Sequence, residues 1–196
     1  MTKKILMLGW EFPPLINGGL GIACYGIAKA LAKKADVSLI IPKAETNFVV
    51  ENVELIGLND TRTEELVNDK ALLDFKDFLE VDYVKANIMP YQSVKTKSPA
   101  TTEKKELKYL DDLNFFKHED VYGGDILSNV MKYTNAAVHI ALNKEFDVIH
   151  AHDWMTFFAG MQIKSLTGKP LVLHVHSTEV DRSSADNKGV VYEIER

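Results

Sequence analysis

The sequence contains a single cysteine, Cys24, so no disulfide can form within the chain. It has no long hydrophobic run either, because the apolar stretch that starts at Ile5 is interrupted by Glu11 and the prolines after it. That stretch is too short for a signal peptide or a membrane span. Basic residues are not in excess: 23 lysines and arginines face 28 acids, and a net charge of -5 argues against an electrostatic nucleic-acid binder. We therefore expect a cytoplasmic protein that binds neither membranes nor nucleic acids.

What the sequence does contain is an alternation of short apolar runs and helical patterns. With 196 residues and 46% hydrophobic content it can bury the core of one domain, which we place at residues 1–196. The predicted strands cover residues 4–9, 36–41, 52–56, 81–84, 146–151 and 171–175, and the last two are expected to be buried. The predicted helices cover residues 20–34, 64–78, 125–144 and 155–166, and a predicted mobile insert covers residues 93–108. This alternation is typical of the α/β class, with a parallel sheet covered by helices on both faces.

A glycine-rich turn joins the first predicted strand to the first predicted helix, and it reads P-L-I-N-G-G-L-G over residues 14–21. Gly18 and Gly19 let backbone amides approach a ligand, and the helix behind them adds a positive dipole end, so the turn is a candidate phosphate site. The alternative is that the two glycines only make a tight turn. The turn matches neither the G-x-G-x-x-G fingerprint nor the P-loop pattern, so it is not an ordinary NAD or P-loop site.

Four of the six histidines form two H-x-H pairs, each at the carboxyl end of a predicted strand. Residues i and i+2 of a strand face the same side, so each pair presents two imidazoles together. One predicted helix separates the two strands, which makes them candidate neighbours, and ligands bind at this edge of open α/β sheets. The pairs are His150-Ala151-His152 and His174-Val175-His176.

Three interpretations of the histidine pairs stay open. The four imidazoles with Asp153 or Asp181 have the chemistry of a zinc or iron site, although no long-range ligand spacing supports it. Hydrogen bonds at the strand ends would explain the inner histidine of each pair, which lies deeper in the apolar run. For His152 and His176, at the rim, we favour hydrogen bonds to a ligand.

Two carboxylates lie beside these motifs. Asp153 stands at a strand-to-helix junction, where it can cap the next helix or orient an imidazole, and Trp154 after it supplies a buried wall. Glu11 is flanked by Trp10 and Phe12 in the loop beside the glycines. A carboxylate in that position calls for a polar partner such as a sugar hydroxyl or an arginine, unless it is simply exposed on the loop.

Together, four motifs resemble the N-terminal domain of bacterial glycogen and starch synthases and their retaining glycosyltransferase relatives. They appear in the family's order and span residues 5–182. The resemblance implies a GT-B architecture, in which two Rossmann-like domains face each other over a cleft. It also implies transfer of glucose from a nucleotide sugar, ADP-glucose or UDP-glucose, to an α-glucan with retention, with no required metal and no cofactor beyond that donor. The motifs are W-E-F-P-P at 10–14, N-G-G-L-G at 17–21, V-I-H-A-H-D-W at 148–154 and H-V-H-S-T-E at 174–179.

The same resemblance assigns roles to residues. Gly18 and Gly19 match the loop that meets the donor phosphates, His152 matches the histidine that contacts the transferred sugar, and Glu11 matches the acidic residue near the sugar and acceptor. His152 and Glu11 are therefore the expected catalytic residues. The expected sugar and acceptor cleft also includes Asp153, His176, Ser177 and Glu179.

This chain departs from the synthase pattern at three positions. The synthase loop typically has lysine and aspartate where this chain has Ile16 and Ile22, and asparagine where it has Ser177. A relative with another donor or acceptor therefore stays open.

The chain ends at Arg196, where the resembled family continues toward its nucleotide-binding domain. We expect these residues to be the acceptor-side half of the enzyme, inactive alone, with the C-terminal nucleotide-binding domain as its partner. Two alternatives stay open: a metal-dependent hydrolase built on the two H-x-H pairs, and a non-catalytic glucan-binding module.

Overall fold

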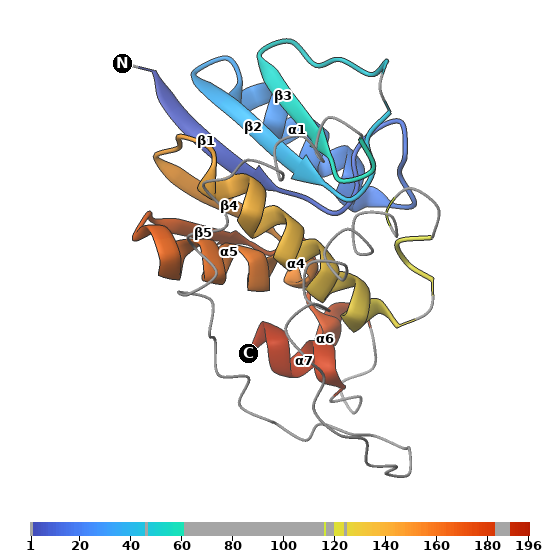
Figure 1. The fold of residues 1–196 in the computed structure, drawn as a ribbon. Helices are drawn as coiled ribbons and strands as arrows, with labels where there is room; N and C mark the ends of the chain where they lie inside the picture. The colour runs from blue at the N-terminus through green and yellow to red at the C-terminus, as the bar shows by residue number, and fades with distance from the viewer. Residues whose placement is uncertain (1, 46, 61–115, 117–119, 124, 183–188) are drawn as a thin grey trace, which may run out of the picture.

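The computed structural model of the chain describes residues 2–45, 47–60, 116, 120–123, 125–182 and 189–196. Within them, five strands form one sheet whose neighbouring strands are all parallel, in the order β3-β2-β1-β4-β5 (Figure 1). The strands are β1 (Lys3–Leu8), β2 (Ala35–Ile41), β3 (Val53–Gly57), β4 (Val148–His152) and β5 (Leu171–His174). The helices are α1 (Gly19–Leu31), α4 (Ile126–Leu142), α5 (Trp154–Thr167), α6 (Glu179–Arg182) and α7 (Val190–Glu195).

The sheet is covered on both faces, because its strands are apolar on both sides. In β1, Leu6 and Leu8 belong to the core that includes α4 and α5, whereas Met7 between them belongs to the core under α1. This is the alternation that a strand imposes on successive side chains. Figure 1 shows α4 and α5 on one side of the sheet and α1 on the other. The predicted Rossmann-like parallel sheet with helices on both faces is confirmed.

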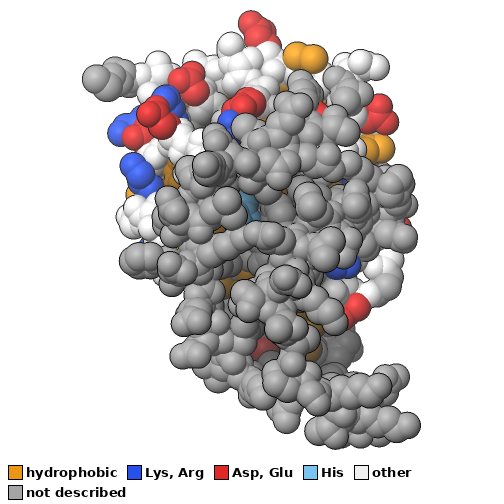
Figure 2. All heavy atoms as spheres, in the orientation of Figure 1, with side chains coloured by type: hydrophobic (Ala, Val, Ile, Leu, Met, Phe, Trp, Pro, Cys, Tyr) orange, Lys and Arg blue, Asp and Glu red, His pale blue; other side chains and the backbone are white. Residues whose placement is uncertain are grey.

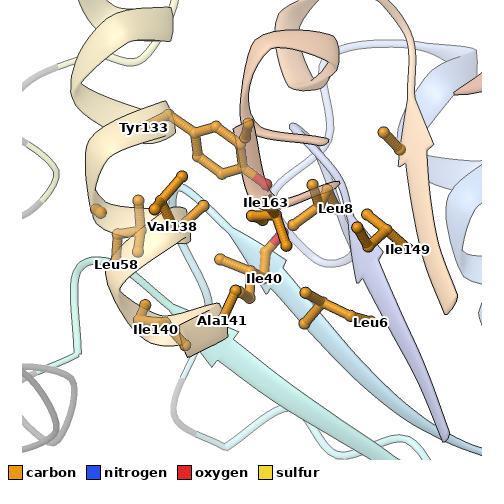
Figure 3. Packing of buried hydrophobic residues seen from close by; sticks show 14 of the residues in the cluster. Leu6, Leu8, Ile40, Leu58, Tyr133, Val138, Ile140, Ala141, Ile149 and Ile163 are labelled. Carbon is orange, nitrogen blue, oxygen red and sulfur yellow. Dashed lines mark hydrogen bonds between the residues drawn. The ribbon is translucent and has the colours of Figure 1, made fainter. Parts of the chain in front are cut away.

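The larger core is organised around Tyr133 of α4, which is fully buried among aliphatic side chains (Figure 3). Its hydroxyl donates a hydrogen bond of 3.0 Å to the carbonyl oxygen of Ile40, so the one polar atom of the ring is satisfied. Trp10, directly after β1, packs edge-to-face on Tyr133 with ring centroids 5.4 Å apart. The loop that begins with Trp10 therefore starts from a fixed point in the core.

Helix ends follow local sequence signals. Asp125 caps α4 by accepting a hydrogen bond of 3.1 Å from the Leu127 amide. Gly168 ends α5 with a φ of 69°, a left-handed conformation that favours glycine. Each predicted element within the described residues is present, with its ends shifted by up to three residues. The predicted helix at 64–78, strand at 81–84 and insert at 93–108 lie outside the described residues.

One expectation about β5 is wrong. The sequence predicts a buried strand, but Val172 and Leu173 are 49% and 46% exposed. The reason is position: among the strands that the structure describes, only β4 lies beside β5. An apolar run alone does not reveal whether its strand is central or at an edge.

The order of the strands creates a topological switch point at the carboxyl edge of the sheet. β1 pairs with β2 on one side and with β4 on the other, and the helices that follow β1 and β4 cover opposite faces. The loops after β1 and β4 therefore diverge at a topological switch point, where open α/β sheets bind ligands.

The amino ends of the strands are different, because ion pairs gather there. Lys4 pairs with Glu145 at 2.6 Å, and its backbone amide donates to Asp147. Figure 2 shows acidic and basic side chains intermingled on this flank. None of the described helices combines the length and apolar character needed to cross a membrane.

Candidate functional site

The two H-x-H pairs lie side by side, as the sequence predicts. β4 and β5 are neighbours, and His152 is directly opposite His174 in the strand register. The imidazoles form two hydrogen-bonded pairs: His150 Nε2 with His174 Nδ1 at 3.2 Å, and His152 Nδ1 with His176 Nε2 at 2.8 Å. His174 and His176 stack with centroids 4.4 Å apart, whereas the rings of His150 and His152, with centroids 4.2 Å apart, are tilted by 43°.

Burial favours the neutral form of His150, His152 and His176. Desolvation, with weaker repulsion from the neighbouring rings, lowers the pKa of His150 to about 4 and that of His152 to about 2. Desolvation also lowers the pKa of His176. Near neutral pH these three rings therefore act as hydrogen-bond donors and acceptors rather than as cations.

His152 is fully buried, and one of its ring nitrogens is left without a protein partner. Its Nδ1 is engaged by His176, but Nε2 has no hydrogen-bond partner in the part of the chain that the structure describes. Buried polar atoms are normally paired, and leaving one unpaired costs about 1–3 kcal/mol. A ligand group at Nε2 would remove that cost.

The cluster also has the composition of a metal site. Ligand atoms of Cys24, His152 and His176 lie within 4.8 Å of one another, as do those of His150, His152 and His174. In a chelate the nitrogen lone pairs point at the ion. At 2.8 Å the facing nitrogens of His152 and His176 instead share a proton, so the observed arrangement favours hydrogen bonding over chelation.

Asp153 ties the two strand ends together. Its Oδ1 accepts a hydrogen bond of 2.7 Å from the His176 amide, and its own amide donates to the His174 carbonyl at 2.9 Å. It stands at the N-cap of α5 but makes no side-chain cap hydrogen bond, so helix capping by its carboxylate is not what the structure shows. Its φ of 60° and ψ of 168° are strained for a non-glycine residue, a feature that clusters at functional sites.

Glu11 is 6% exposed and hydrogen-bonded on both oxygens, so an exposed loop position is excluded. Its Oε2 accepts from the amides of Asn17 and Gly18, each at 3.3 Å, and its Oε1 accepts from the Tyr122 hydroxyl. The carboxylate thus engages two amides of the glycine turn from inside the protein. Such amides are the donors that an anion would use.

The three glycines of the turn differ in their surroundings. A Cβ added at Gly18 or Gly19 would meet no described atom within 4 Å, whereas one at Gly21 would collide with Ile16 and lie 3.1 Å from Glu11 Cβ. Gly21 is therefore required for packing of the turn on α1. Gly18 and Gly19 face open space, which leaves room for a ligand.

The turn after β1 and the histidine pairs belong to one site. The Cys24 thiol on α1, the helix that begins at the turn, lies within 4.8 Å of ring nitrogens of His152 and His176. The Tyr122 hydroxyl donates to Glu11 beside the turn, and burial is the main cause of its raised pKa. Burial raises the pKa of Cys24 to about 12, so it stays a neutral thiol. Cys24 is fully buried, as the sequence predicts.

Two of the expected cleft residues make other contacts. Glu179 pairs with Arg182 at 3.2 Å, and Arg182 also binds Glu195 at 2.8 Å, which links α6 to α7. Arg182 further donates to the Ser177 carbonyl at 2.6 Å. Ser177 and Glu179 are thus part of the support behind the strand ends, and nothing in the structure brings them to the His152 nitrogen.

Sequence reasoning missed Tyr122 and Thr156. Tyr122 lies 111 positions from Glu11, so no local pattern joins them. The Thr156 hydroxyl donates to the carbonyl oxygens of His152 and Asp153, at 2.9 and 3.1 Å, and fixes the start of α5. The sequence signal that could have identified Thr156 is its position in the first helical turn after a strand. These contacts complete a Rossmann-like ligand-binding domain with a buried polar site at its switch point.

Comparisons with known proteins agree on one family. A family model described as the starch synthase catalytic domain matches residues 4–193. An uncharacterised glycosyltransferase of Methanocaldococcus jannaschii is 27% identical over 191 residues, 95% of this chain and 35% of that protein. A glycogen synthase of Thermodesulfovibrio yellowstonii is 33% identical over 183 residues, 84% of this chain and 33% of that protein.

A solved structure shares the fold. The catalytic domain of starch synthase IV from Arabidopsis thaliana, bound to ADP and acarbose, matches with a TM-score of 0.52 and 16% identity over 100% of this chain and 39% of that one. The chain belongs to the starch synthase catalytic domain family, and its fold is that of one Rossmann-like domain of the GT-B type. It spans about a third of the length of the curated relatives named above.

Proposed function

We propose that this domain is the acceptor-side half of a retaining glucosyltransferase. In the complete enzyme it would transfer glucose from ADP-glucose or UDP-glucose to an α-glucan in the cytoplasm, where Cys24 stays reduced. A second, nucleotide-binding domain would close the cleft from the other side. The family and the relatives called glycogen synthase support a glycosyltransferase, and the family alone supports a nucleotide sugar and a glucan as its substrates.

The observation that carries the proposal is the buried Nε2 of His152 at the switch point, which has no partner among the described residues. Beside it is a glycine turn in which no described atom lies within 4 Å of a Cβ added at Gly18 or Gly19. A neutral imidazole suits a sugar hydroxyl, because it donates or accepts one hydrogen bond without adding charge. The open turn suits the donor phosphates. The two groups sit on adjacent strand ends, as a nucleotide sugar requires.

Chemically, the domain would contribute electrostatic stabilisation. A leaving diphosphate and an oxocarbenium-like sugar need preorganised hydrogen bonds more than a strong nucleophile. We assign diphosphate contacts to the amides of the turn and the sugar contact to His152. Because Glu11 engages the Asn17 and Gly18 amides, the donor phosphate would take over these two amides, and Glu11 would then face the sugar and acceptor.

The test compares this chain with a version extended through the reading frame beyond Arg196. The 196-residue chain should show no transfer with either donor and should bind a nucleotide sugar in the millimolar range, about 4 kcal/mol. The extended protein should elongate a glucan. Clear turnover by the short chain would refute the half-enzyme proposal, and an extended protein that binds glucan without transfer would indicate the glucan-binding alternative.

A further inference from the structure

The hydrogen bond between His152 and His176 couples a buried nitrogen to a more exposed one. The two rings are nearly in one plane, 23° apart, with centroids at 5.1 Å and the facing nitrogens at 2.8 Å. His152 is fully buried, while His176 is partly exposed. The second nitrogen of His152, Nε2, has no hydrogen-bond partner among the residues that the structure describes.

The number of protons on the two rings restricts which tautomers His152 and His176 can adopt. Desolvation lowers both pKa values, so each ring carries one proton near neutral pH. A bond between His152 Nδ1 and His176 Nε2 needs one proton between them. If His152 supplies it, both rings are protonated at Nδ1; if His176 supplies it, both are protonated at Nε2. A mixed pair would set two protons or two lone pairs against each other at 2.8 Å.

We propose that His176 is a positioning residue that fixes the hydrogen-bond polarity of His152. Its tautomer decides whether the buried Nε2 of His152 donates to a ligand hydroxyl or accepts from it. That the ligand is a sugar rests on the proposed function; the coupling of the two tautomers does not. His176 acts through His152 and needs no contact of its own with the sugar.

The surroundings of His176 suit this role. Its amide is bound to the Asp153 carboxylate at 2.7 Å, and its ring stacks on His174 with an interplanar angle of 10°. The backbone and one ring face are thus held while Nε2 points at His152. Orientation of a buried imidazole by a second group is a general way to select its tautomer.

Nitrogen NMR of the 15N-labelled 196-residue chain tests the coupling directly. We expect His152 and His176 to show the same tautomer, both protonated at Nδ1 or both at Nε2. In His176→Leu the Nδ1 signal of His152 should move, while in the neighbouring control Val175→Ala it should stay. Opposite tautomers in the native protein, or an unmoved Nδ1 signal in His176→Leu, would overturn the proposal.

Kinetics of the extended enzyme test the consequence. The terminal amide of glutamine can replace an imidazole Nε2, so His176→Gln should stay within about threefold of the native kcat, whereas His176→Leu should lose about tenfold or more with an unchanged donor KM. Equal losses in both variants, or a rise in KM alone, would show direct substrate contact and refute positioning. If the native enzyme transfers no glucose, the proposed function fails, while the NMR result still decides the coupling.

Discussion

The glycine turn and the histidine strand ends are built in opposite ways. At the strand ends, hydrogen bonds of 3.2 and 2.8 Å pair the four imidazoles, and His152 is fully buried. The Asp153 carboxylate accepts a further bond of 2.7 Å from the His176 backbone amide. In the turn, a Cβ at Gly18 or Gly19 would meet no described atom within 4 Å, and two amides reach Glu11 only at 3.3 Å. One region is organised before a ligand arrives, and the other is held by weak bonds that an anion can replace.

The contrast follows from what each region can satisfy alone. Imidazoles donate and accept, so neighbouring strands can pair them without a ligand. Backbone N–H groups only donate, so the turn needs an acceptor, and Glu11 supplies one. A ligand would therefore bind a preorganised His152 at little entropic cost, while binding at the turn requires the Glu11 carboxylate to release the two amides.

The largest expected effect comes from a substitution at the preorganised strand ends. In the extended enzyme, His152→Ala should raise the activation free energy by about 2 to 4 kcal/mol and so lower kcat, by analogy with the loss of one oxyanion donor. The reason is that a contact to the transferred sugar contributes most in the transition state, where the sugar ring gains positive charge. Steady-state kinetics with both donors measure it, and nucleotide binding should change far less.

The matched control is His139→Ala, which removes a histidine from α4 on the other face of the sheet. It should leave kcat near the native value. If His152→Ala instead kept kcat and lowered only the melting temperature, His152 would be a structural residue and the site assignment would be wrong.

Acidification should weaken the strand ends. His152 has a pKa of about 2 when folded against 6.5 when unfolded, so between those values only the unfolded chain takes up the proton. The free energy of unfolding is therefore not reduced by this residue above pH 6.5. It decreases as the pH is lowered, by about 2 kcal/mol at pH 5. Urea unfolding at pH 7, 6 and 5 measures this loss.

The control is His150→Gln, which removes a second histidine whose pKa is lowered, to about 4. The slope of unfolding free energy against pH between 6 and 5 should become shallower in this variant. Glu54 does not interfere, because a carboxyl with a lowered pKa loses its stabilisation only below its unfolded value of 4.5. An unchanged slope would contradict burial of neutral imidazoles.

The sequence predicts the preorganised side better than the open one, for physical reasons. Parallel strands end at the same edge, so two H-x-H pairs on adjacent strands must meet, and the structure confirms that. The exposure of β5 could not be predicted, because it depends on which strands flank it. The role of Asp153 depends on a φ of 60° that no pattern reveals, and Tyr122 reaches Glu11 from a distant segment.

A pair of glycine variants separates packing from ligand binding in the turn. Gly21→Ala should lower the free energy of unfolding by about 1 to 3 kcal/mol, because its Cβ collides with Ile16. Gly18→Val should leave stability nearly unchanged, since its φ of -161° suits any residue and the added atoms meet open space. It should instead raise the donor KM of the extended enzyme by about tenfold, or 1.4 kcal/mol.

Thermal unfolding and donor kinetics of both variants provide the readout. A Gly18→Val enzyme with a native donor KM would show that the turn does not hold the phosphates. A Gly21→Ala protein of native stability would mean that the turn moves aside easily, and the contrast with the strand ends would then be larger than the structure indicates.

The smallest expected effect concerns metal, and it addresses the hydrolase alternative. The facing nitrogens of His152 and His176 are hydrogen-bonded to each other, so purified protein should hold no stoichiometric zinc or iron. Chelator treatment should leave its melting temperature unchanged. Elemental analysis and thermal unfolding with and without EDTA measure both. One metal per chain, lost together with stability in the double variant His150→Ala and His174→Ala, would replace the hydrogen-bonded pairs by a chelate. It would shift the proposed chemistry from sugar transfer to metal-assisted hydrolysis.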